Sequence, residues 1–233
     1  MPLRIGHRGA SGTHPENTLA AFRRAVELGV QGIEFDVHRT ADGELVVMHD
    51  PMVDRTTAGT GLIMTMTLAQ IKSLEAGAWK GPEFAGEPVP TLREVIRATP
   101  ADLLLFCELK AGSIHYPGIE QDLLALIEAE GARSRFQISS FDHKALKQIH
   151  ELSPTMPLGM LYEENLLDPI SMARAIGATA LHPAWMWVTP ELVKEAHAAG
   201  LTVNTWVVDL PPFIDMMKGA GVDGIMSNYP DRL

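Results

Sequence analysis

Apolar segments of strand length alternate with segments of helical periodicity along nearly the whole sequence. This alternation restricts the fold more than any other feature, because it is typical of a parallel sheet built from strand–helix units. The pattern recurs about eight times. The expected strands are Leu3–His7, Gly32–His38, Leu103–Glu108, Phe136–Ser140, Leu158–Tyr162, Ala180–Pro183, Thr202–Val207 and Gly224–Ser227.

Helical segments separate the expected strands. In the first of them Leu19, Phe22 and Val26 recur on one face, as an amphipathic helix requires. Asn17 or Thr18 is expected to cap its start. The other expected helices are one that begins near Thr91 and the segments Ile119–Glu130, Asp142–Leu152, Pro169–Ile176, Pro190–Ala199 and Pro212–Ala220.

About eight strand–helix units in 233 residues predict an α/β fold of the (β/α)8 TIM-barrel type, for which about 250 residues is typical. A doubly wound open sheet is the alternative. We expect one barrel domain over residues 1–233, with a small insertion after the second strand at residues 51–90. That segment is rich in Gly, Thr and Pro and is far longer than an ordinary connection. Only six residues follow Ser227, so the eighth helix is expected to be missing or reduced to a turn.

Charge and cysteine content argue against several classes of function. The sequence has 19 Lys and Arg against 29 Asp and Glu, a net charge of −10 at pH 7, and an acidic protein repels nucleic acid and anionic lipid. We expect no nucleic-acid partner and no stable membrane association. Cys107 is the single cysteine, so no internal disulfide can form. The sequence shows neither a signal-peptide core nor an apolar run of about 18 residues, and we expect a cytoplasmic protein. Nothing in the sequence indicates an oligomeric state.

Polar side chains gather at the carboxyl ends of the expected strands, where the active site of an α/β barrel lies. The second strand places Glu34 and Asp36 on one face and Phe35 and Val37 on the other, because side chains alternate along a strand. Two carboxylates that face the same way at a strand end seldom serve packing. The other polar residues near strand ends are His7 and Arg8, Glu108 and Lys110, and, after Leu45–Met48, His49 and Asp50.

Glu34, Asp36 and Glu108 form an all-oxygen set of candidate metal ligands, which suits Mg²⁺ or Ca²⁺ rather than zinc. Arg8 and Lys110 add positive charge. With a divalent ion, these two cations would balance the three carboxylates and one bound phosphodiester. The sequence therefore predicts a site that holds a metal and a phosphate.

His7 and His49 could transfer protons beside that site, because imidazole titrates near neutral pH. Together these residues predict metal-assisted cleavage of a phosphodiester with a histidine acid/base pair. We favour His49 as the acid and His7 as the base.

The order and spacing of these motifs resemble those of the glycerophosphodiester phosphodiesterases, and the resemblance spans residues 3–231. The motifs that carry it are His7-Arg8-Gly9, Pro15-Glu16-Asn17-Thr18, Glu34-Phe35-Asp36-Val37, Asp42-Gly43, Val46-Val47-Met48-His49-Asp50, Glu108-Leu109-Lys110, Trp206 and Asn228-Tyr229-Pro230-Asp231.

That resemblance implies a TIM barrel with a segment inserted after its second strand. It also implies dependence on Ca²⁺ or Mg²⁺ and hydrolysis of a small-molecule glycerophosphodiester to sn-glycerol 3-phosphate and an alcohol. The site residues it implies are the metal ligands Glu34, Asp36 and Glu108, the acid/base pair His7 and His49, and the phosphate-binding cations Arg8 and Lys110.

Several other residues have simpler interpretations. Thr18 is expected to cap a helix, and His38 to lie one step outside the metal ligands. Cys107 is expected to be an inert thiol that faces the helices. His182 either lines the site or packs within the barrel. Trp206 is expected to bind substrate as part of an apolar wall.

Two alternative functions stay open at this point. A lysophospholipase D-type phosphodiesterase would need an exposed apolar groove, which Leu62, Ile63, Met64 and Met66 of the insertion could supply. A non-catalytic phosphoester-binding barrel would need the cations and the metal ligands but no acid/base pair. The presence of two suitably placed histidines favours an enzyme over that second alternative.

Overall fold

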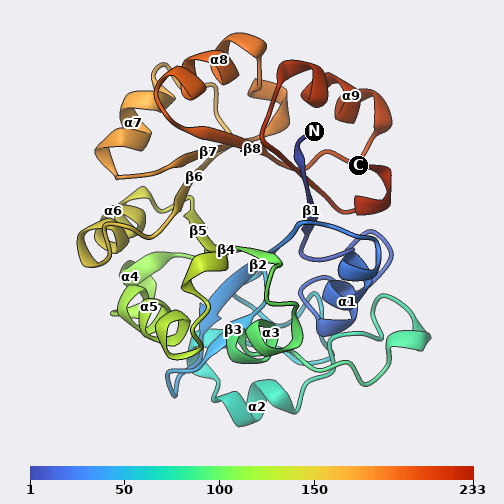
Figure 1. Cartoon of the computed structure of the whole chain (residues 1–233). Helices are drawn as coiled ribbons and strands as arrows, with labels where there is room; N and C mark the ends of the chain where they lie inside the picture. The colour runs from blue at the N-terminus through green and yellow to red at the C-terminus, as the bar shows by residue number, and fades with distance from the viewer.

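The strands close into a barrel. The computed structural model describes all 233 residues apart from the side chain of Ser113, and within these residues eight parallel strands follow one another around a ring (Figure 1). β1 pairs with both β2 and β9, so the sheet has no free edge at that point. This closure confirms the TIM barrel and excludes the open sheet. The strands of the ring are β1 (Leu3–His7), β2 (Gly32–Arg39), β4 (Leu104–Leu109), β5 (Phe136–Ser140), β6 (Leu158–Tyr162), β7 (Ala180–Pro183), β8 (Thr202–Thr205) and β9 (Gly224–Ser227).

Strand bounds differ from the prediction by one or two residues in three strands, β2, β4 and β8. The largest difference is in β8, which ends at Thr205 rather than Val207. Trp206 forms only an isolated bridge to Ala184, and the Val208 amide then turns to the carbonyl of Met226. An apolar run marks a buried strand but does not show where its ladder of hydrogen bonds stops.

One further strand, β3 (Leu45–Val47), was not predicted as a strand and pairs antiparallel with the end of β2. A tight turn at residues 40–44 connects the two, with Gly43 in the left-handed region at φ +89°. β3 carries the chain back beside Asp36, because the Met48 amide donates to the Asp36 carbonyl at 3.1 Å. It therefore delivers His49 to the end of the barrel.

Helices cover the outside of the ring. Several of them are preceded by a residue whose side chain caps the first turn of the helix. Thr18 caps α1 through the amide of Ala21, Thr91 and Glu94 form a capping box at α3, and Asp142 caps α6. The predicted helices are confirmed. Their bounds are α1 (Leu19–Glu27), α3 (Leu92–Ala98), α5 (Ile119–Ala129), α6 (His143–Leu152), α7 (Pro169–Ala175), α8 (Pro190–Ala198) and α9 (Pro211–Ala220). One short helix that was not predicted, α4 (Gly112–His115), precedes α5.

The last strand is followed by a single 3-10 turn, η5 (Pro230–Arg232), in place of a helix, as predicted. Arg232 lies over the ring of Tyr229 with 3.8 Å between the guanidinium carbon and the ring centroid, and it donates to the carbonyl of Asp209 at 3.0 Å. These contacts hold the turn against the barrel without an eighth helix.

The insertion lies beside β2 and β3 (Figure 1). It has its own small apolar cluster. Its regular elements are η1 (Ile63–Thr65), α2 (Leu68–Lys72) and η2 (Pro82–Phe84). Neighbouring residues of β3 join the insertion to the barrel, because Val46 belongs to the insertion cluster whereas Val47 belongs to the main core. The remaining buried members of the cluster are Met48, Val53, Ile63, Ile71, Ala76 and Val89.

The main core lies between the barrel and its helices. Phe35, Val37 and Cys107 belong to it and are fully buried, while Glu34 and Asp36 occupy the alternate positions of β2 and face into the barrel. The predicted alternation along β2 and the orientation of Cys107 are thus confirmed. In the part of the chain that the structure describes, no helix combines the length and the apolar character needed to cross a bilayer.

Candidate active site

Strand register brings the predicted acidic residues and His7 together. β1 and β2 are paired so that His7 lies opposite Glu34, and β2 and β4 so that Asp36 lies opposite Glu108. His7 is the last residue of β1 and Glu108 lies near the end of β4, so this register places Glu34 and Asp36 of the longer β2 at the same end of the barrel. Neighbouring strands of a parallel sheet are about 5 Å apart, so this register alone puts the three carboxylates within reach of one ion.

The backbone turns sharply just after β1 and brings Arg8 beneath the carboxylates. Arg8 has a left-handed φ of +52°, an uncommon conformation for a residue with a side chain. Its amide donates to Glu34 Oε2 at 3.0 Å. Gly9 continues the turn at φ +82°, where a Cβ atom would come within 2.7 Å of the backbone of Ala21. Strain of this kind persists where the surrounding contacts fix the backbone, and it is common at functional sites.

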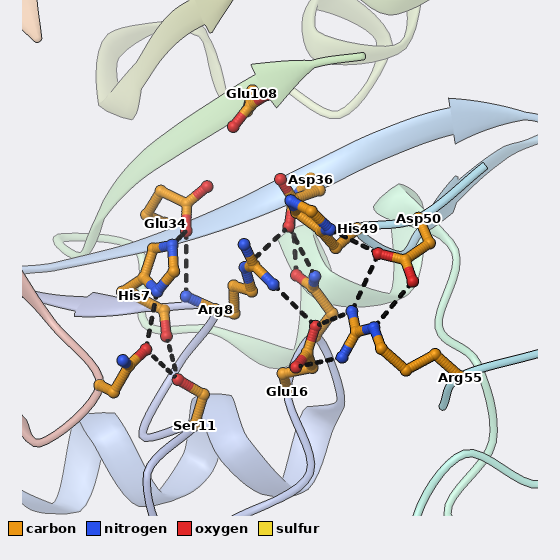
Figure 2. Close-up of polar contacts among 12 residues, drawn as sticks. His7, Arg8, Ser11, Glu16, Glu34, Asp36, His49, Asp50, Arg55 and Glu108 are labelled. Atoms are coloured by element: carbon orange, nitrogen blue, oxygen red, sulfur yellow. Dashed lines mark hydrogen bonds and ion pairs between the residues drawn. The ribbon is translucent and has the colours of Figure 1, made fainter. Parts of the chain in front are cut away.

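The three candidate ligands Glu34, Asp36 and Glu108 form a buried cluster (Figure 2). One oxygen from each lies within 4.8 Å of the others. Burial and the charges of Asp36 and Glu108 raise the pKa of Glu34 well above its usual value. Burial and the charge of Asp36 raise the pKa of Glu108 to about 7, against the opposing effect of Lys110. The cluster thus holds negative charge that the protein compensates only in part.

Asp36 is the point at which the two predicted cations meet. Lys110 Nζ lies 3.0 Å from Asp36 Oδ1 and 2.5 Å from Glu108 Oε1, and Arg8 Nε lies 3.4 Å from Asp36 Oδ2. Although burial opposes ionisation, Lys110 and Arg8 hold the pKa of Asp36 far below its usual value. Asp36 is therefore the carboxylate that stays ionised.

Asn17 has a larger part in the site than the helix-capping residue predicted from the sequence. It adopts a left-handed φ of +59°, and its Nδ2 donates to Asp36 Oδ2 at 2.7 Å while its Oδ1 accepts from the Asp36 amide at 3.3 Å. Asn17 thus fixes the rotamer of Asp36, and the helix cap is Thr18 alone.

His7 is held by a chain of polar residues from the segments that follow β1, β8 and β9. Its Nδ1 lies 2.7 Å from Asn228 Oδ1, which also accepts from Ser11. Asn228 Nδ2 donates to Asp209 at 2.7 Å, so the amide oxygen must face His7 and Nδ1 of His7 must carry the proton. The lone pair of Nε2 then points toward Glu34, whose Oε2 is 3.8 Å away. Burial lowers the pKa of His7 to about 4.

His49 has an anionic partner where His7 has a neutral one. Its Nδ1 lies 2.6 Å from Asp50 Oδ1, and its backbone carbonyl is contacted by His38 Nε2 at 3.1 Å. Burial lowers the pKa of His49, while the charge of Asp36 and the hydrogen bond to Asp50 oppose this. His38, itself held by Tyr116 at 2.8 Å, supports His49 from outside the ligand set, where the sequence analysis placed it.

Arg55 of the insertion was not singled out from the sequence, although it contacts both Asp50 and Glu16. Glu16 in turn accepts from Arg8 Nη1 at 2.8 Å. Only the tertiary structure brings Arg55 to this place, since a lone arginine in a long connection has no distinguishing pattern. The same holds for Asp209, which follows β8 in sequence but supports a residue of β9.

The predicted site residues surround one opening at this end of the barrel, with Asp36 buried just beneath it. Trp206 forms part of the wall. Its Nε1 donates to the carbonyl of His182 at 2.8 Å, and its ring stands nearly perpendicular to that of Phe141, with 5.5 Å between centroids. The lining residues are His7, Arg8, Glu34, His49, Glu108, Lys110, Ser139, Phe141, Leu161, His182, Trp206 and Met226.

Two remaining predictions have mixed outcomes. His182 is fully buried and contacts Gln137 and Asn204 inside the barrel, while its edge reaches the lining of the opening. In the insertion, Ile63 is fully buried in the local cluster and cannot line a groove. Leu62 and Met64 are partly exposed instead.

Comparisons with known proteins agree in one result. The sequence matches the model of the family described as the Glycerophosphoryl diester phosphodiesterase family over residues 7–232. It is 44% identical over 232 residues to a glycerophosphodiester phosphodiesterase of Caldanaerobacter subterraneus subsp. tengcongensis, covering 99% of this chain and 96% of that protein. It is 35% identical to a glycerophosphodiester phosphodiesterase of Bacillus altitudinis, covering 98% and 95% of the two chains.

Solved structures give the same answer for the fold. The structure of an Oleispira antarctica phosphodiesterase in complex with the product sn-glycerol-3-phosphate superposes with a TM-score of 0.88. The two sequences are 31% identical, and the match covers 98% of this chain and 93% of the other. A glycerophosphodiester phosphodiesterase from Agrobacterium tumefaciens superposes with the same TM-score at 27% identity, covering 100% and 98% of the two chains.

Proposed function

The chain belongs to the glycerophosphoryl diester phosphodiesterase family, and on this premise we propose that it hydrolyses glycerophosphodiesters to sn-glycerol 3-phosphate and an alcohol with a divalent cation and two histidines. Family membership makes it a glycerophosphodiester phosphodiesterase. One observation carries the finer proposal: three buried carboxylates, two cations and two histidines converge on a single opening.

The carboxylate cluster has the chemistry that a hard divalent cation requires. Its three oxygens lie within 4.8 Å of one another, and Asp36 Oδ1 receives no hydrogen bond from the residues that the structure describes, although Lys110 stands 3.0 Å away as an ion pair. Oxygen ligands without sulfur or imidazole suit Mg²⁺ or Ca²⁺. When bound by Glu34, Asp36 and Glu108, such an ion would polarise the phosphate oxygens as a Lewis acid.

The positive side chains around the cluster support binding of a phosphate. Arg8 and Lys110 each contact Asp36 and also line the opening, so both can reach an anion that enters it. The Oleispira antarctica relative holds sn-glycerol-3-phosphate, and we propose the same product for this chain. Trp206 and Phe141 would then border the apolar side of a small-molecule substrate.

His7 is suited to be the general base. Its Nδ1 proton is fixed by Asn228, so Nε2 presents a lone pair toward the carboxylates. Because burial lowers its pKa to about 4, the ring is neutral near pH 7 and ready to take a proton from the nucleophile.

His49 is suited to be the general acid. Burial lowers the pKa of His49, but the Asp50 carboxylate accepts from its Nδ1 at 2.6 Å and opposes that shift by favouring the imidazolium form. Nε2 of that imidazolium could protonate the alkoxide as it leaves. A purely binding barrel has no need of two imidazoles held in this way.

Product release from a panel of substrates tests the proposal. We expect sn-glycerol 3-phosphate from glycerophosphocholine, glycerophosphoethanolamine and glycerophosphoglycerol in the presence of Mg²⁺ or Ca²⁺, and none after exhaustive chelation. A full rate without any bound metal would refute the metal assignment. If a lysophospholipid is cleaved while all three glycerophosphodiesters resist, the lysophospholipase D-type alternative replaces the proposal.

A further inference from the structure

Arg55 makes an unusually complete set of hydrogen bonds for a side chain that is 44% exposed. Its Nη1 and Nη2 donate to the two oxygens of Glu16 at 2.9 and 2.7 Å. Its Nε and Nη2 donate to the two oxygens of Asp50 at 2.7 and 3.0 Å. One guanidinium thus holds two carboxylates, each through a paired contact (Figure 2).

Each of these carboxylates also holds a residue of the candidate active site. Asp50 Oδ1 contacts His49 Nδ1 at 2.6 Å, and Glu16 Oε1 accepts from Arg8 Nη1 at 2.8 Å. A continuous path of polar contacts therefore runs from His49 through Asp50, Arg55 and Glu16 to Arg8. We call Asp50, Arg55 and Glu16 the Arg55 bridge.

We propose that Arg55 is a positioning residue for the reaction, which fixes the proton-transferring His49 and the phosphate-binding Arg8 in one geometry. The inference rests on the proposed function, because that function gives His49 its role in proton transfer and Arg8 its role in phosphate binding. Arg55 itself is absent from the lining of the opening among the described residues, so it acts through its partners and not on the substrate.

The geometry explains why this position needs an arginine. Glu16 and Asp50 are two carboxylates close enough to share one guanidinium, and without a cation between them they would repel each other. A planar guanidinium presents donors in a fixed fork that matches a carboxylate edge, whereas an ammonium is a point charge that cannot hold two carboxylates edge-on. Lysine would supply the charge without fixing either orientation.

The path also links two segments that are not neighbours in sequence. Glu16 lies before α1, and Arg55 lies in the insertion after β3. Without the bridge, Asp50 would be free to rotate in solvent, and the Nδ1–H of His49 would lose its fixed acceptor. On the other side Glu16 would no longer restrain Arg8, which still contacts Asp36.

Two measurements separate the contact to His49 from the contact to Arg8. Kinetics with two leaving groups report on His49, and binding of product reports on Arg8. In Arg55→Gln we expect kcat on glycerophosphocholine to fall about 10- to 100-fold, the range for a lost supporting contact, and much less on a p-nitrophenyl diester of glycerol phosphate, which leaves without a proton. Affinity for sn-glycerol 3-phosphate should fall about tenfold in calorimetry. Asp50→Asn should show mainly the first effect and Glu16→Gln mainly the second.

Two further variants control the experiment. Arg55→Lys should resemble Arg55→Gln if the fork matters, and the wild type if only charge matters. Arg97→Gln removes a comparable fork, since Arg97 Nε and Nη2 bind Glu130 at 2.7 and 3.0 Å far from the opening. It should leave kcat and product affinity unchanged. A role in stability alone would lower the melting temperature of Arg55→Gln without the leaving-group dependence.

The inference is overturned if Arg55→Gln keeps both kcat and product affinity within twofold of the wild type, or if Arg55→Lys restores both. Failure of the proposed function would look different, because the wild type itself would cleave neither diester. In that case the ¹⁵N chemical shifts of the His49 ring test the positioning role of Arg55, because they report which ring nitrogen carries the proton. A fixed Nδ1–H tautomer in the wild type and a mixture in Arg55→Gln support the positioning role, and the same tautomer in both proteins overturns it.

Discussion

Glu34 is a single residue whose buried charge lowers the stability of the folded chain. It is 4% exposed, and it lies beside two other carboxylates and inside the barrel. Burial and those neighbours raise its pKa, which means that its ionised form costs free energy in the folded chain. A side chain held against this cost is expected to have a role that packing alone does not explain.

We therefore predict that Glu34→Gln abolishes metal-dependent turnover but does not destabilise the protein in the presence of chelator. The amide keeps an oxygen that can accept from the Arg8 amide while it removes the buried charge. Thermal unfolding at pH 8 in EDTA should occur at the wild-type temperature or above it, by about 2–4 °C for each kcal/mol gained. Addition of Mg²⁺ or Ca²⁺ should stabilise the wild type but not Glu34→Gln.

The matched control is Glu191→Gln on the exposed side of α8, which should behave like the wild type in both assays. A lower melting temperature for Glu34→Gln in chelator would show that the carboxylate is needed for folding, and metal stabilisation equal to that of the wild type would remove Glu34 from the ligand set.

The two histidines should respond differently to the leaving group. His7→Ala and His49→Ala should each reduce kcat on glycerophosphocholine by about 10²–10⁴-fold, the range for a positioned acid or base. A p-nitrophenolate leaving group needs no proton, so it should rescue His49→Ala and not His7→Ala. Rescue of His7→Ala alone would reverse the roles, and near wild-type kcat for both variants would rule out the acid/base pair.

At the scale of elements, the barrel interior depends on one glycine of β6. The ring of His182 on β7 lies directly over Gly159, where a Cβ atom would come within 2.5 Å of it. The two strands are paired, with Leu161 opposite His182. His182 can therefore point into the barrel only because the residue beside it has no side chain.

We predict that Gly159→Ala destabilises the protein by about 1–3 kcal/mol through overpacking. In the background of His182→Ala the same substitution should cost much less, with a coupling of about 0.5–3 kcal/mol in a double-mutant cycle measured by urea unfolding. Gly219→Ala in α9, where nothing lies within 4 Å, should instead stabilise by about 0.4–1 kcal/mol. Additive effects of Gly159→Ala and His182→Ala would contradict the assigned contact.

At the scale of the whole molecule, buried histidines make the fold sensitive to acid. Burial lowers the pKa of His182 to about 3 and that of His38 to about 4, from a usual value of 6.5. Above pH 6.5 both rings are neutral in the folded and unfolded chain and have no effect. Below it the unfolded chain takes up protons that the folded chain refuses, so acid favours unfolding.

The free energy of unfolding should accordingly fall as the pH is lowered from 6.5 to 4.5, with each of these histidines contributing up to about 1.4 kcal/mol per pH unit. Denaturant titrations at several pH values give the slope of the free energy of unfolding against pH. This slope should be shallower for His182→Gln than for the wild type, by the equivalent of about one proton, because the contribution of the carboxylates is the same in both proteins. An unchanged slope would show that His182 is protonated in the folded state. The exposed His115→Gln variant should keep the wild-type slope.

The sequence alone determined the architecture and the composition of the site. Alternation of apolar strands and amphipathic helices is a local property, so it identified the barrel, its order and the reduced last helix without knowledge of contacts. The period of two along β2 placed Glu34 and Asp36 on the inner face. The carboxyl ends of the parallel strands lie at the same end of a barrel, so His7, Glu108 and their neighbours were predicted to lie at one site.

Only the tertiary structure decided how those residues are held. Closure of the barrel through β1 and β9, the short β3 that carries His49, and the contacts of Asn17, Asp209 and Arg55 all join residues distant in sequence. Such contacts depend on register, loop path and side-chain rotamer, which leave no periodic pattern in a single sequence. The residue types of the candidate site can therefore be recognised in the sequence, whereas the orientation of their side chains is a property of the folded chain.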